Sequence, residues 1–389
     1  MQKLPKMFIK FLLPLLFVTL HFKSMAANGV PMPDHVVIVI LENHGYSEII
    51  GATTAPHINA LATDPFSALF THSFAVAHPS QPNYIDFYSG CNQGITTDNL
   101  PANTPFTTAN LGRQLIDSGK TFITYSESLP SVGYNGATSG TYARKHNPAA
   151  NWMGTGTNQI PSTTNQPLTA FPSSNFASLP TVCYVIPNMT NDMHNGSDPA
   201  RITLGDNWVY NNLNNYIQWA KTNNSLLILT FDENDNSAGN QITTIFTGAM
   251  VLAGQYSDTI NHYSVLRTIE DMYNLPYACN AAAAATISSC WITPTEVSAS
   301  QLMSETQFSV YPNPFCDETI IKYKLDKTQN TSLEIYDLEG REIQCFSRDH
   351  LEQNSGEYNY HFYPKQAGIY FVKLSVGSVV LTEKIISVK

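Results

Sequence analysis

The chain has 389 residues, with 20 Lys and Arg against 30 Asp and Glu, so its formal net charge is −10. Its length allows two or three domains of ordinary size. Proteins that bind nucleic acid usually carry a stripe of Lys and Arg, and an acidic chain is unlike such proteins. We therefore expect no nucleic-acid partner.

The first 26 residues predict a signal peptide. Three lysines lead into the apolar run FLLPLLFVTL, and SMA at residues 24–26 is a small-x-small cleavage site. The run is about 10 residues, short of the roughly 20 that span a bilayer, so a membrane anchor is the weaker alternative. No later segment is apolar enough to span, and we expect a protein that is exported through the periplasm and is secreted or held at the cell surface.

Residues 27–295 predict a single α/β domain. Short, continuously apolar runs alternate with longer amphipathic ones, which is typical of a mostly parallel sheet covered by helices. The polar segment 133–178 is predicted to be a long loop or insertion. The predicted strands are VVIVIL, TFITYSE, TVCYVIP, SLLILTF and TIFTGAMVLAG, and the predicted helices are NLGRQLIDSG, GDNWVYNNLNNYIQWAKTN and SVLRTIEDMYNLP.

The last part of the chain has a different pattern. A polar linker without periodicity is expected at 296–307. Residues 308–389 contain short alternating segments separated by turn residues, which predict a small antiparallel β-sandwich. These segments are ETIIKYKL, TSLEIYDLEGREI, EYNYHFY, GIYFVKLSV and VVLTEKIISV.

The six cysteines lack the spacing of a zinc site, and an exported chain meets oxidising conditions, so disulfides are expected. Cys279 and Cys290 enclose an Ala-rich loop with no other obvious anchor, and we predict that they pair. Cys316 with Cys345 is a further possibility. Cys183 lies in an apolar run and is expected to be a buried thiol.

Acidic side chains follow two predicted strands. Glu42 and Asn43 come directly after VVIVIL, and Asp232, Glu233 and Asp235 follow SLLILTF. Asn43 as a helix cap and solvated loop acids are the structural alternatives. Ligands bind at the carboxyl ends of strands in such sheets, however, and carboxylates from two strands can converge on one hard cation.

Ser80 lies in the rigid turn AHPSQPNY, between Pro79 and Pro82, and Asn83 opens an apolar helical run. The hydroxyl could simply cap that helix. A metal-bound, deprotonated serine at a helix N-terminus would instead be a good nucleophile toward phosphorus.

Four histidines occur in polar segments: His78, His146, His194 and His262, with Asp192 two residues before His194. Each alone is more often structural. Together they could supply the donors and the acid that phosphoryl transfer needs.

Taken in order, these segments resemble the phosphoesterase family of bacterial acid phosphatases and phosphatidylcholine-type phospholipases C, within the alkaline phosphatase superfamily. The resemblance covers about 34–276 and implies a three-layer α/β/α sandwich. It is carried by IVILENHGYSEIIG, HPSQPNYIDFYSG, LGRQLIDSGKTFITYSESLP, YARKHNP, VIPNMTNDMHNG, GDNWV, LILTFDEND and NHYSVLRTIEDMYNL.

The resemblance also implies the roles of the site residues, with Ser80 forming a phosphoserine that water then hydrolyses. Glu233 stands where the superfamily often has a histidine, so one divalent metal rather than two is expected. His262 receives no role. The expected metal ligands are Glu42, Asn43, Ser80, Asp232 and Glu233; the catalytic group is Ser80, His78, His146 and His194; and the substrate-binding group is Asn43, Asn83, Asp192 and Glu233.

The tail is similar to the type IX secretion sorting domain of Bacteroidetes, through VYPNPF, LEIYDLEGREI, GIYFVKL and EKIISVK. This implies recognition by the type IX secretion machinery and later removal. A carbohydrate-binding or adhesive β-module is the alternative.

We expect an acid phosphatase that acts on a small phosphate monoester, because the catalytic region is compact. The alternatives are a phospholipase C that acts on phospholipid head groups and a noncatalytic surface protein that binds metal or glycans.

Overall fold

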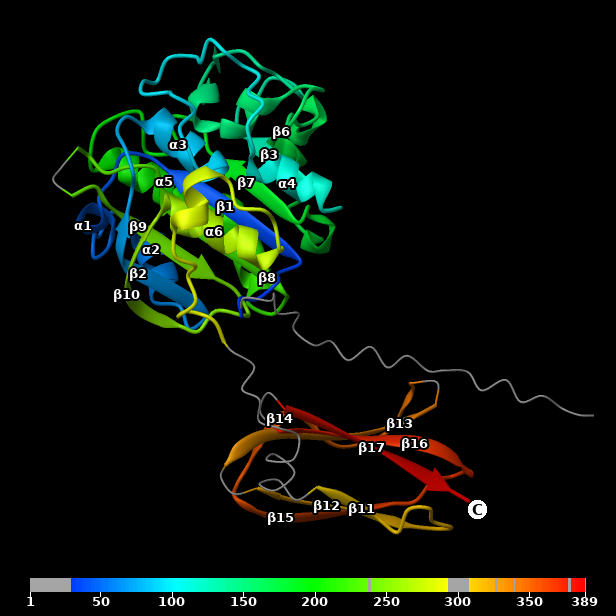
Figure 1. The fold of residues 1–389 in the computed structure, drawn as a ribbon. Coiled ribbons are helices and arrows are strands. Elements are labelled where there is room, and N and C mark those ends of the chain that lie inside the picture. The colour runs from blue at the N-terminus through cyan, green and yellow to red at the C-terminus, as the bar shows by residue number, and fades with distance from the viewer. Residues whose placement is uncertain are drawn as a thin grey trace, which may run out of the picture. The chain divides into compact units, whose positions relative to one another are not determined.

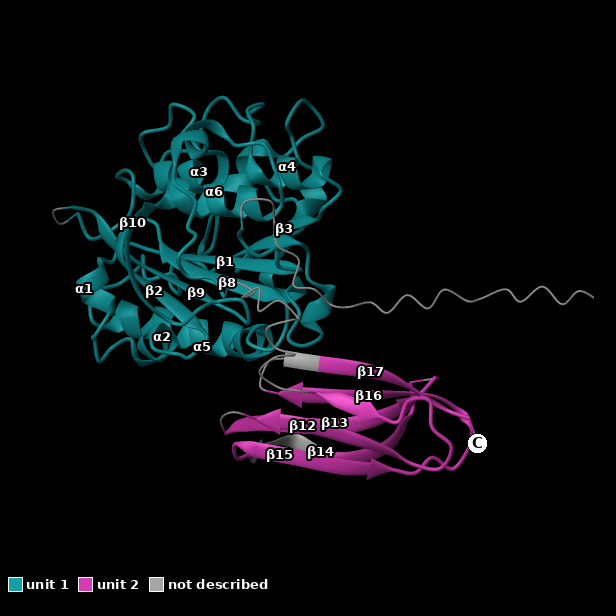
Figure 2. Cartoon of the chain, turned by 60° about the horizontal axis from the view of Figure 1, so that its bottom comes forward, with its two compact units in different colours: residues 1–293 teal, residues 294–389 magenta. Residues whose placement is uncertain are grey.

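The computed structural model describes residues 29–236, 239–292, 308–325, 328–338, 340–376 and 379–388. The predicted signal peptide and linker lie outside these residues. The chain divides into two compact units, Met1–Thr293 and Pro294–Lys389 (Figure 2). Each unit is described by itself.

An eight-stranded sheet forms the centre of the first unit, in the order β10-β2-β9-β8-β1-β7-β3-β6 (Figure 1). Strand β9 runs antiparallel to both β2 and β8, and the other pairs are parallel. The predicted mostly parallel α/β sheet is therefore confirmed. The strands are β1 His35–Leu41, β2 Ser67–Phe74, β3 Phe122–Ser126, β6 Asn165–Pro167, β7 Val182–Ile186, β8 Ser225–Phe231, β9 Gln241–Thr247 and β10 Gly254–Asn261.

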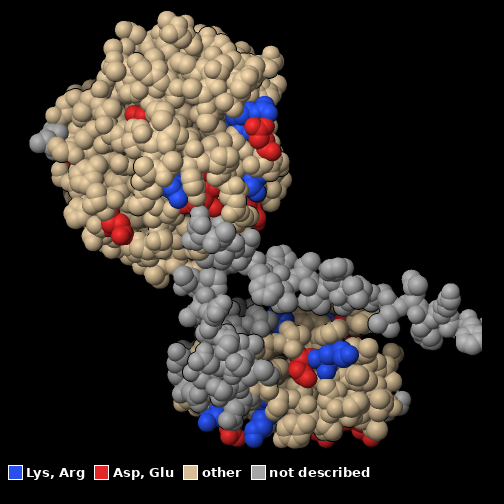
Figure 3. Space-filling model, viewed as in Figure 1, with Lys and Arg blue, Asp and Glu red and all other residues tan. Residues whose placement is uncertain are grey.

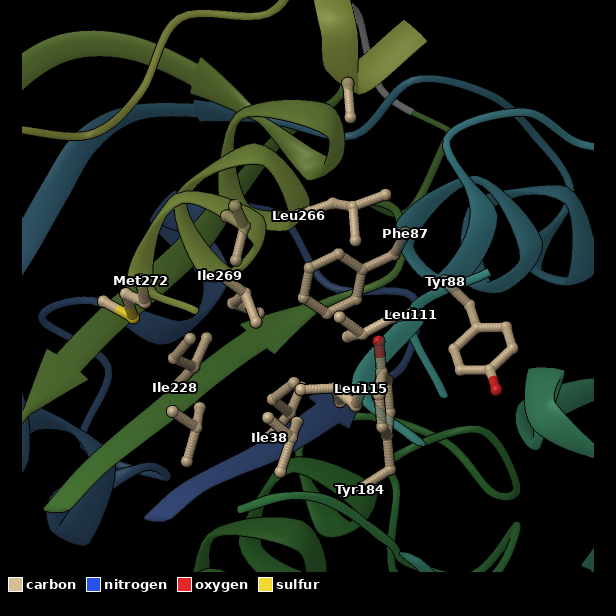
Figure 4. Close-up of a cluster of buried hydrophobic side chains, with 14 of the residues drawn as sticks. Ile38, Phe87, Tyr88, Leu111, Leu115, Tyr184, Ile228, Leu266, Ile269 and Met272 are labelled. Atoms are coloured by element: carbon tan, nitrogen blue, oxygen red, sulfur yellow. The ribbon is translucent and has the colours of Figure 1, made fainter. Parts of the chain in front are cut away.

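Helices cover both faces of this sheet, because its central strands are apolar on both sides. In β1, Val36 and Ile38 belong to one buried cluster, while Val37 and Val39 belong to the other. Figure 4 shows side chains of α3, α4 and α6 packed over Ile38 in the first cluster. Helices α3 Ser80–Ser89, α4 Leu111–Asp117 and α6 His262–Met272 contribute to that cluster, and α1 Tyr46–Ile49, α2 Pro56–Ala62 and α5 Ala200–Ala220 contribute to the second.

Three strands of the sheet, β2, β6 and β10, escaped prediction. In β10 most side chains are exposed or half-buried, so it lacks an apolar run, and β2 ends in the polar stretch THSF. Strand β9 also begins earlier than expected and ends at Thr247. The edge strands β6 and β10 are weakly encoded, because one neighbour and partial solvent contact do not require apolar side chains. Strand β2 has a neighbour on each side, and only its polar end obscures its pattern.

The segment predicted as a long loop, 133–178, contains only short elements. These are β4 Thr138–Ser139, β5 Tyr142–Ala143, the strand β6, and the 3-10 turns η1 Arg144–His146, η2 Pro148–Trp152, η3 Ser162–Thr164, η4 Leu168–Ala170 and η5 Phe176–Ser178. A further turn, η6 Cys279–Ala283, follows α6.

The second unit is an antiparallel β structure, as predicted. Its strands form sheets of order β11-β12-β15 and β14-β13-β16-β17. Burial alternates along β12, so that Ile321, Tyr323 and Leu325 enter the core. The strands are β11 Ser309–Tyr311, β12 Thr319–Leu325, β13 Gln329–Asp337, β14 Glu342–Gln353, β15 Gly356–Phe362, β16 Gly368–Val376 and β17 Val379–Ser387.

Charged side chains are sparse on the face of the first unit shown in Figure 3, where blue and red atoms lie in small groups. This agrees with a chain in which only 13% of residues are Asp, Glu, Lys or Arg. Within the described ranges, no helix has the length and apolar character to cross a membrane.

The predicted Cys279–Cys290 disulfide is wrong, because Cys279 pairs with Cys91. Gly90 ends α3 in the left-handed conformation, and its carbonyl accepts a hydrogen bond from Asn280 N, which brings the two cysteines together. Cys290 is a buried free thiol, as is Cys183, whose burial was expected. Cys316 and Cys345 are also free, so the possible second pair is not formed.

The Ala-rich loop also has an anchor that the sequence did not reveal. Arg267 of α6 donates hydrogen bonds to the carbonyls of Ala281 and Ala282, and Ile287 N donates to Thr268 Oγ1. These contacts hold the loop on α6 without a disulfide across its ends.

We predict that peptide mapping under nonreducing conditions will find Cys91 linked to Cys279. Replacing both with serine should lower the free energy of unfolding by about 3–5 kcal/mol, because the cross-link closes a long loop of the unfolded chain. The matched control, Cys290→Ser, removes no cross-link and should leave the mapped pair intact. A Cys279–Cys290 peptide would contradict the assignment.

Candidate active site

Ser80 is the first residue of α3, and its hydroxyl does not cap the helix. Pro79 occupies the N-cap position, and no side-chain cap bond is present there. Instead Ser80 Oγ donates to Glu42 Oε2 at 2.9 Å, with Glu233 Oε1 at 3.2 Å. The simple capping interpretation is therefore wrong, and the hydroxyl lies between two carboxylates at a helix N-terminus.

Asn83 fixes the turn that presents Ser80. Its Oδ1 accepts hydrogen bonds from the amides of Val76 and Ala77, and its Nδ2 donates to the carbonyls of Ala77 and Pro79. Asn83 thus holds the main chain one turn before the serine. Contact between Asn83 and a substrate stays a prediction.

The acidic residues come together because their strands are neighbours. Strands β1 and β8 pair in parallel up to Leu41 and Phe231, so Glu42 and Asp232 leave the sheet side by side. Asn43 N donates to Asp232 Oδ1 at 3.0 Å, and Asn43 Nδ2 donates to Glu42 Oε2 at 3.0 Å. Asn43 adopts φ 53°, a left-handed conformation that asparagine tolerates better than most residues.

Burial makes this acidic cluster electrostatically costly. Burial, followed by the charge of Asp232, raises the pKa of Glu42 to about 8. Burial and Glu233 raise the pKa of Asp232 to about 8, and burial and Glu42 raise that of Glu233 to about 7. Asp232 Oδ2 is buried and has no hydrogen-bond partner among the described residues. Such oxygens fit a hard divalent cation, which would offset the mutual repulsion.

The ring of His146 lies between two carboxylates and is hydrogen-bonded to one of them, Asp192. Its Nδ1 lies 2.9 Å from Asp192 Oδ2, and its Nε2 lies 3.0 Å from Glu42 Oε1. Tyr84, one turn after Ser80, stacks on the ring at a centroid distance of 5.2 Å. Glu42 therefore contacts Ser80 through one carboxylate oxygen and faces His146 and then Asp192 with the other.

Glu42, His146 and His194 form a ligand group that the sequence did not predict. Each offers one ligand atom, and these atoms all lie within 4.8 Å of one another. One carboxylate and two imidazoles also suit a transition metal such as zinc. The cluster thus offers cation ligands on two sides of Glu42.

Sequence reasoning missed Lys145, which adjoins His194. Its Nζ lies 3.0 Å from His194 Nε2 and donates to Asp98 Oδ2 at 2.7 Å. Because an ammonium only donates, His194 Nε2 is the acceptor. Burial, followed by Lys145, lowers the pKa of His194 to about 4. Lys145 directly precedes His146 in YARKHNP, and that adjacency was the available signal.

His78 pairs with the carboxylate of Glu233 through Nδ1, and its side chain is 34% exposed. Of the four histidines, His262 lies apart from this group. It is buried at the start of α6, and its ring contacts the Phe231 carbonyl at 3.0 Å. His262 supports the end of β8, while His78 can meet a ligand from solvent.

The model of the Phosphoesterase family matches residues 52–276, which is more than half of the chain. The chain belongs to the phosphoesterase family. It is therefore a hydrolase of phosphate esters. The model of the secretion system C-terminal sorting domain matches residues 309–389, so this phosphoesterase carries a sorting domain that indicates export.

Curated relatives agree with this assignment. A phosphatidylinositol-3-phosphatase of Mycobacterium tuberculosis is 45% identical over 262 residues, which cover 66% of this chain and 84% of the relative. A phosphate-repressible acid phosphatase of Penicillium chrysogenum is 30% identical, and the match covers 62% of this chain and 60% of the relative. An acid phosphatase of Aspergillus fumigatus is 32% identical, and the match covers 61% of this chain and 54% of the relative. The chain thus spans less than two thirds of these two fungal relatives.

Solved structures show a more distant likeness. An alkaline phosphatase superfamily protein from Vibrio parahaemolyticus aligns with a TM-score of 0.45 and 11% identity, covering 82% of this chain and 83% of that one. A phosphonate monoester hydrolase of Agrobacterium radiobacter aligns with a TM-score of 0.42 and 9% identity, covering 85% and 89%.

We predict that Asp232→Asn will lower the bound metal content and affinity, because it removes a buried anionic ligand. Metal analysis after dialysis and calorimetric titration of the metal-stripped protein measure both. Affinity should also rise between about pH 6 and pH 8, because the raised pKa values of Glu42 and Asp232 mean that a cation must displace protons.

Asp235→Asn is the matched control, because it makes the same change at an exposed carboxyl of the same loop. Its metal content should equal that of the wild type. Equal loss in both variants, or full retention in Asp232→Asn, would contradict the assigned ligand.

Proposed function

We propose that the protein is a metal-dependent phosphomonoesterase that works through a phosphoserine on Ser80. The observation that supports this best is the position of Ser80 Oγ. It lies at the N-terminus of α3 and contacts carboxylates from the exits of two adjacent strands. The amides at the start of the helix favour the negative charge of a phosphoryl group placed against the serine.

In the first step, Ser80 Oγ attacks phosphorus, the new oxygen–phosphorus bond forms, and the ester bond to the alcohol breaks. The hydroxyl proton passes to Glu233, whose other oxygen faces His78 Nδ1. His78 takes that proton and gives the one on Nε2 to the departing alkoxide. The first two proton transfers thus follow the Ser80–Glu233 and Glu233–His78 contacts of the structure.

In the second step, water attacks the phosphoserine, the bond to Ser80 Oγ breaks and inorganic phosphate leaves. His78 accepts the proton of the water, and the same relay returns a proton to Ser80. Asp192 and His146 hold Glu42 against the serine, so they act by positioning. A divalent metal held by Glu42, Asn43, Ser80, Asp232 and Glu233 would supply the positive charge that lowers the pKa of the serine and offsets charge on the phosphoryl oxygens.

The names of the relatives favour a monoester as substrate. Both the acid phosphatases and the phosphatidylinositol-3-phosphatase are named for removing phosphate. A phospholipase C remains the alternative from the sequence, whereas the family assignment contradicts the noncatalytic surface protein. The sorting domain supports export by the type IX machinery, with the signal peptide and the tail removed on the way.

Ser80→Ala should reduce kcat for a soluble phosphate monoester at least about 10³-fold and leave the fold intact, because it removes the nucleophile and no apolar contact. Rapid acid quenching of the wild type followed by mass spectrometry should find a phosphoryl group on Ser80. Ser118→Ala, at an exposed serine after α4, should keep the wild-type rate. A normal rate in Ser80→Ala would remove the mechanism.

The substrate can be tested by comparing two products. Phosphate released from a soluble monoester and phosphocholine released from phosphatidylcholine vesicles would be measured with the same metal-loaded enzyme. We expect phosphate from the monoester and no phosphocholine. Release of phosphocholine alone would establish the phospholipase C alternative, and release of neither by folded, metal-loaded protein would contradict both substrate assignments.

A further inference from the structure

A cavity of about 290 Å³ opens beside the reaction centre. Two of its lining residues directly adjoin residues of the candidate active site in the chain: Gln81 follows Ser80, and Lys145 precedes His146. The remaining walls combine charged, polar and apolar side chains. They come from Asp98, Leu100, Ala137, Thr138, Ala143, Arg144 and Met189.

Arg144 is a buried cation that has no carboxylate partner in the part of the chain that the structure describes. The residue is 3% exposed, and among the described residues its guanidinium donates to the carbonyls of Asn135 and Ala150 and to Thr104 Oγ1. Its Nε has no hydrogen-bond partner among the described residues, and none of their carboxylates forms an ion pair with it. Buried charges are normally paired, so an arginine left with neutral partners favours an anion nearby.

Lys145 adds a second cation to the same cavity, and Asp98 supplies one opposing charge at 2.7 Å. The cavity therefore keeps an excess of one positive charge on its lining residues. Lys145 also contacts His194, which connects the cavity to the catalytic cluster.

We propose that this cavity is a subsite for a second anionic group on the alcohol part of the phosphate ester. The inference deepens the proposed function and rests on it, because it places the reacting phosphate at Ser80 and the second anion beside Arg144 and Lys145. Ligand pockets usually measure about 300–1,000 Å³, so the cavity suits a small charged group and not a pair of acyl chains. The preferred substrates are then bisphosphates, or monoesters whose alcohol carries another phosphate or carboxylate.

Thr138 allows the subsite to be tested without touching the catalytic cluster. It lines the cavity, is exposed, and lies in the two-residue strand β4. Thr138→Glu and Thr138→Lys add opposite charges at the rim, and Thr138→Gln is the uncharged control of similar size. The probes are propyl phosphate and propane-1,3-diol bisphosphate, which differ in the second phosphate.

The wild type should have the higher kcat/KM for the bisphosphate. Thr138→Glu should lower the ratio of the two kcat/KM values about 3- to 10-fold, and Thr138→Lys should raise it by a similar factor, with Thr138→Gln unchanged. These differences should shrink in about 0.5 M salt, because the rim is screened. All four proteins should hydrolyse propyl phosphate alike.

A ratio that is the same in all four proteins would overturn the subsite and leave the proposed function standing. Equal changes on both probes would also overturn it, because they would place the effect at the reacting phosphate. If the metal-loaded wild type hydrolyses neither probe, the proposed function fails first and the subsite fails with it.

Discussion

The structure depends on a cluster of buried carboxylates gathered around one hydroxyl. Glu42, Asp232 and Glu233 are almost fully buried, and their pKa values are raised by burial and by one another. Folding such a group costs free energy unless a cation or protons neutralise it. Ionisable groups with strongly shifted pKa values cluster at functional sites, and carboxylates held together in this way are suited to binding a cation.

The parallel pairing of β1 and β8 makes that cluster possible. Both strands are apolar on both faces and end at the same edge of the sheet, so the first polar residues after each are forced into proximity. Helix α3 then brings Ser80 to the same edge, with its turn held by Asn83. Residues almost 200 positions apart thus meet because strand direction, and not chain distance, determines where side chains emerge.

The residues of the candidate active site differ in how readily the sequence reveals them. Ser80, Glu42 and Asp232 were identifiable because each follows a strong local pattern, a rigid turn or an apolar strand. Lys145 and Asp98 follow no such pattern, and their importance comes from contacts with His194 and with each other. The pairing of Cys91 with Cys279 was also missed, because the C-terminal end of α3 and the turn η6 meet only in the folded protein.

The sequence by itself determined the two-part organisation, the α/β and antiparallel β patterns, and the family, because periodicity and motifs are local properties of the chain. Only the tertiary structure decided that Ser80 bonds to carboxylates and does not cap its helix. It also decided that Arg144 is buried beside a cavity, with no carboxylate partner among the described residues. Burial and pairing depend on distant segments. They exist only once the sheet has brought those segments together.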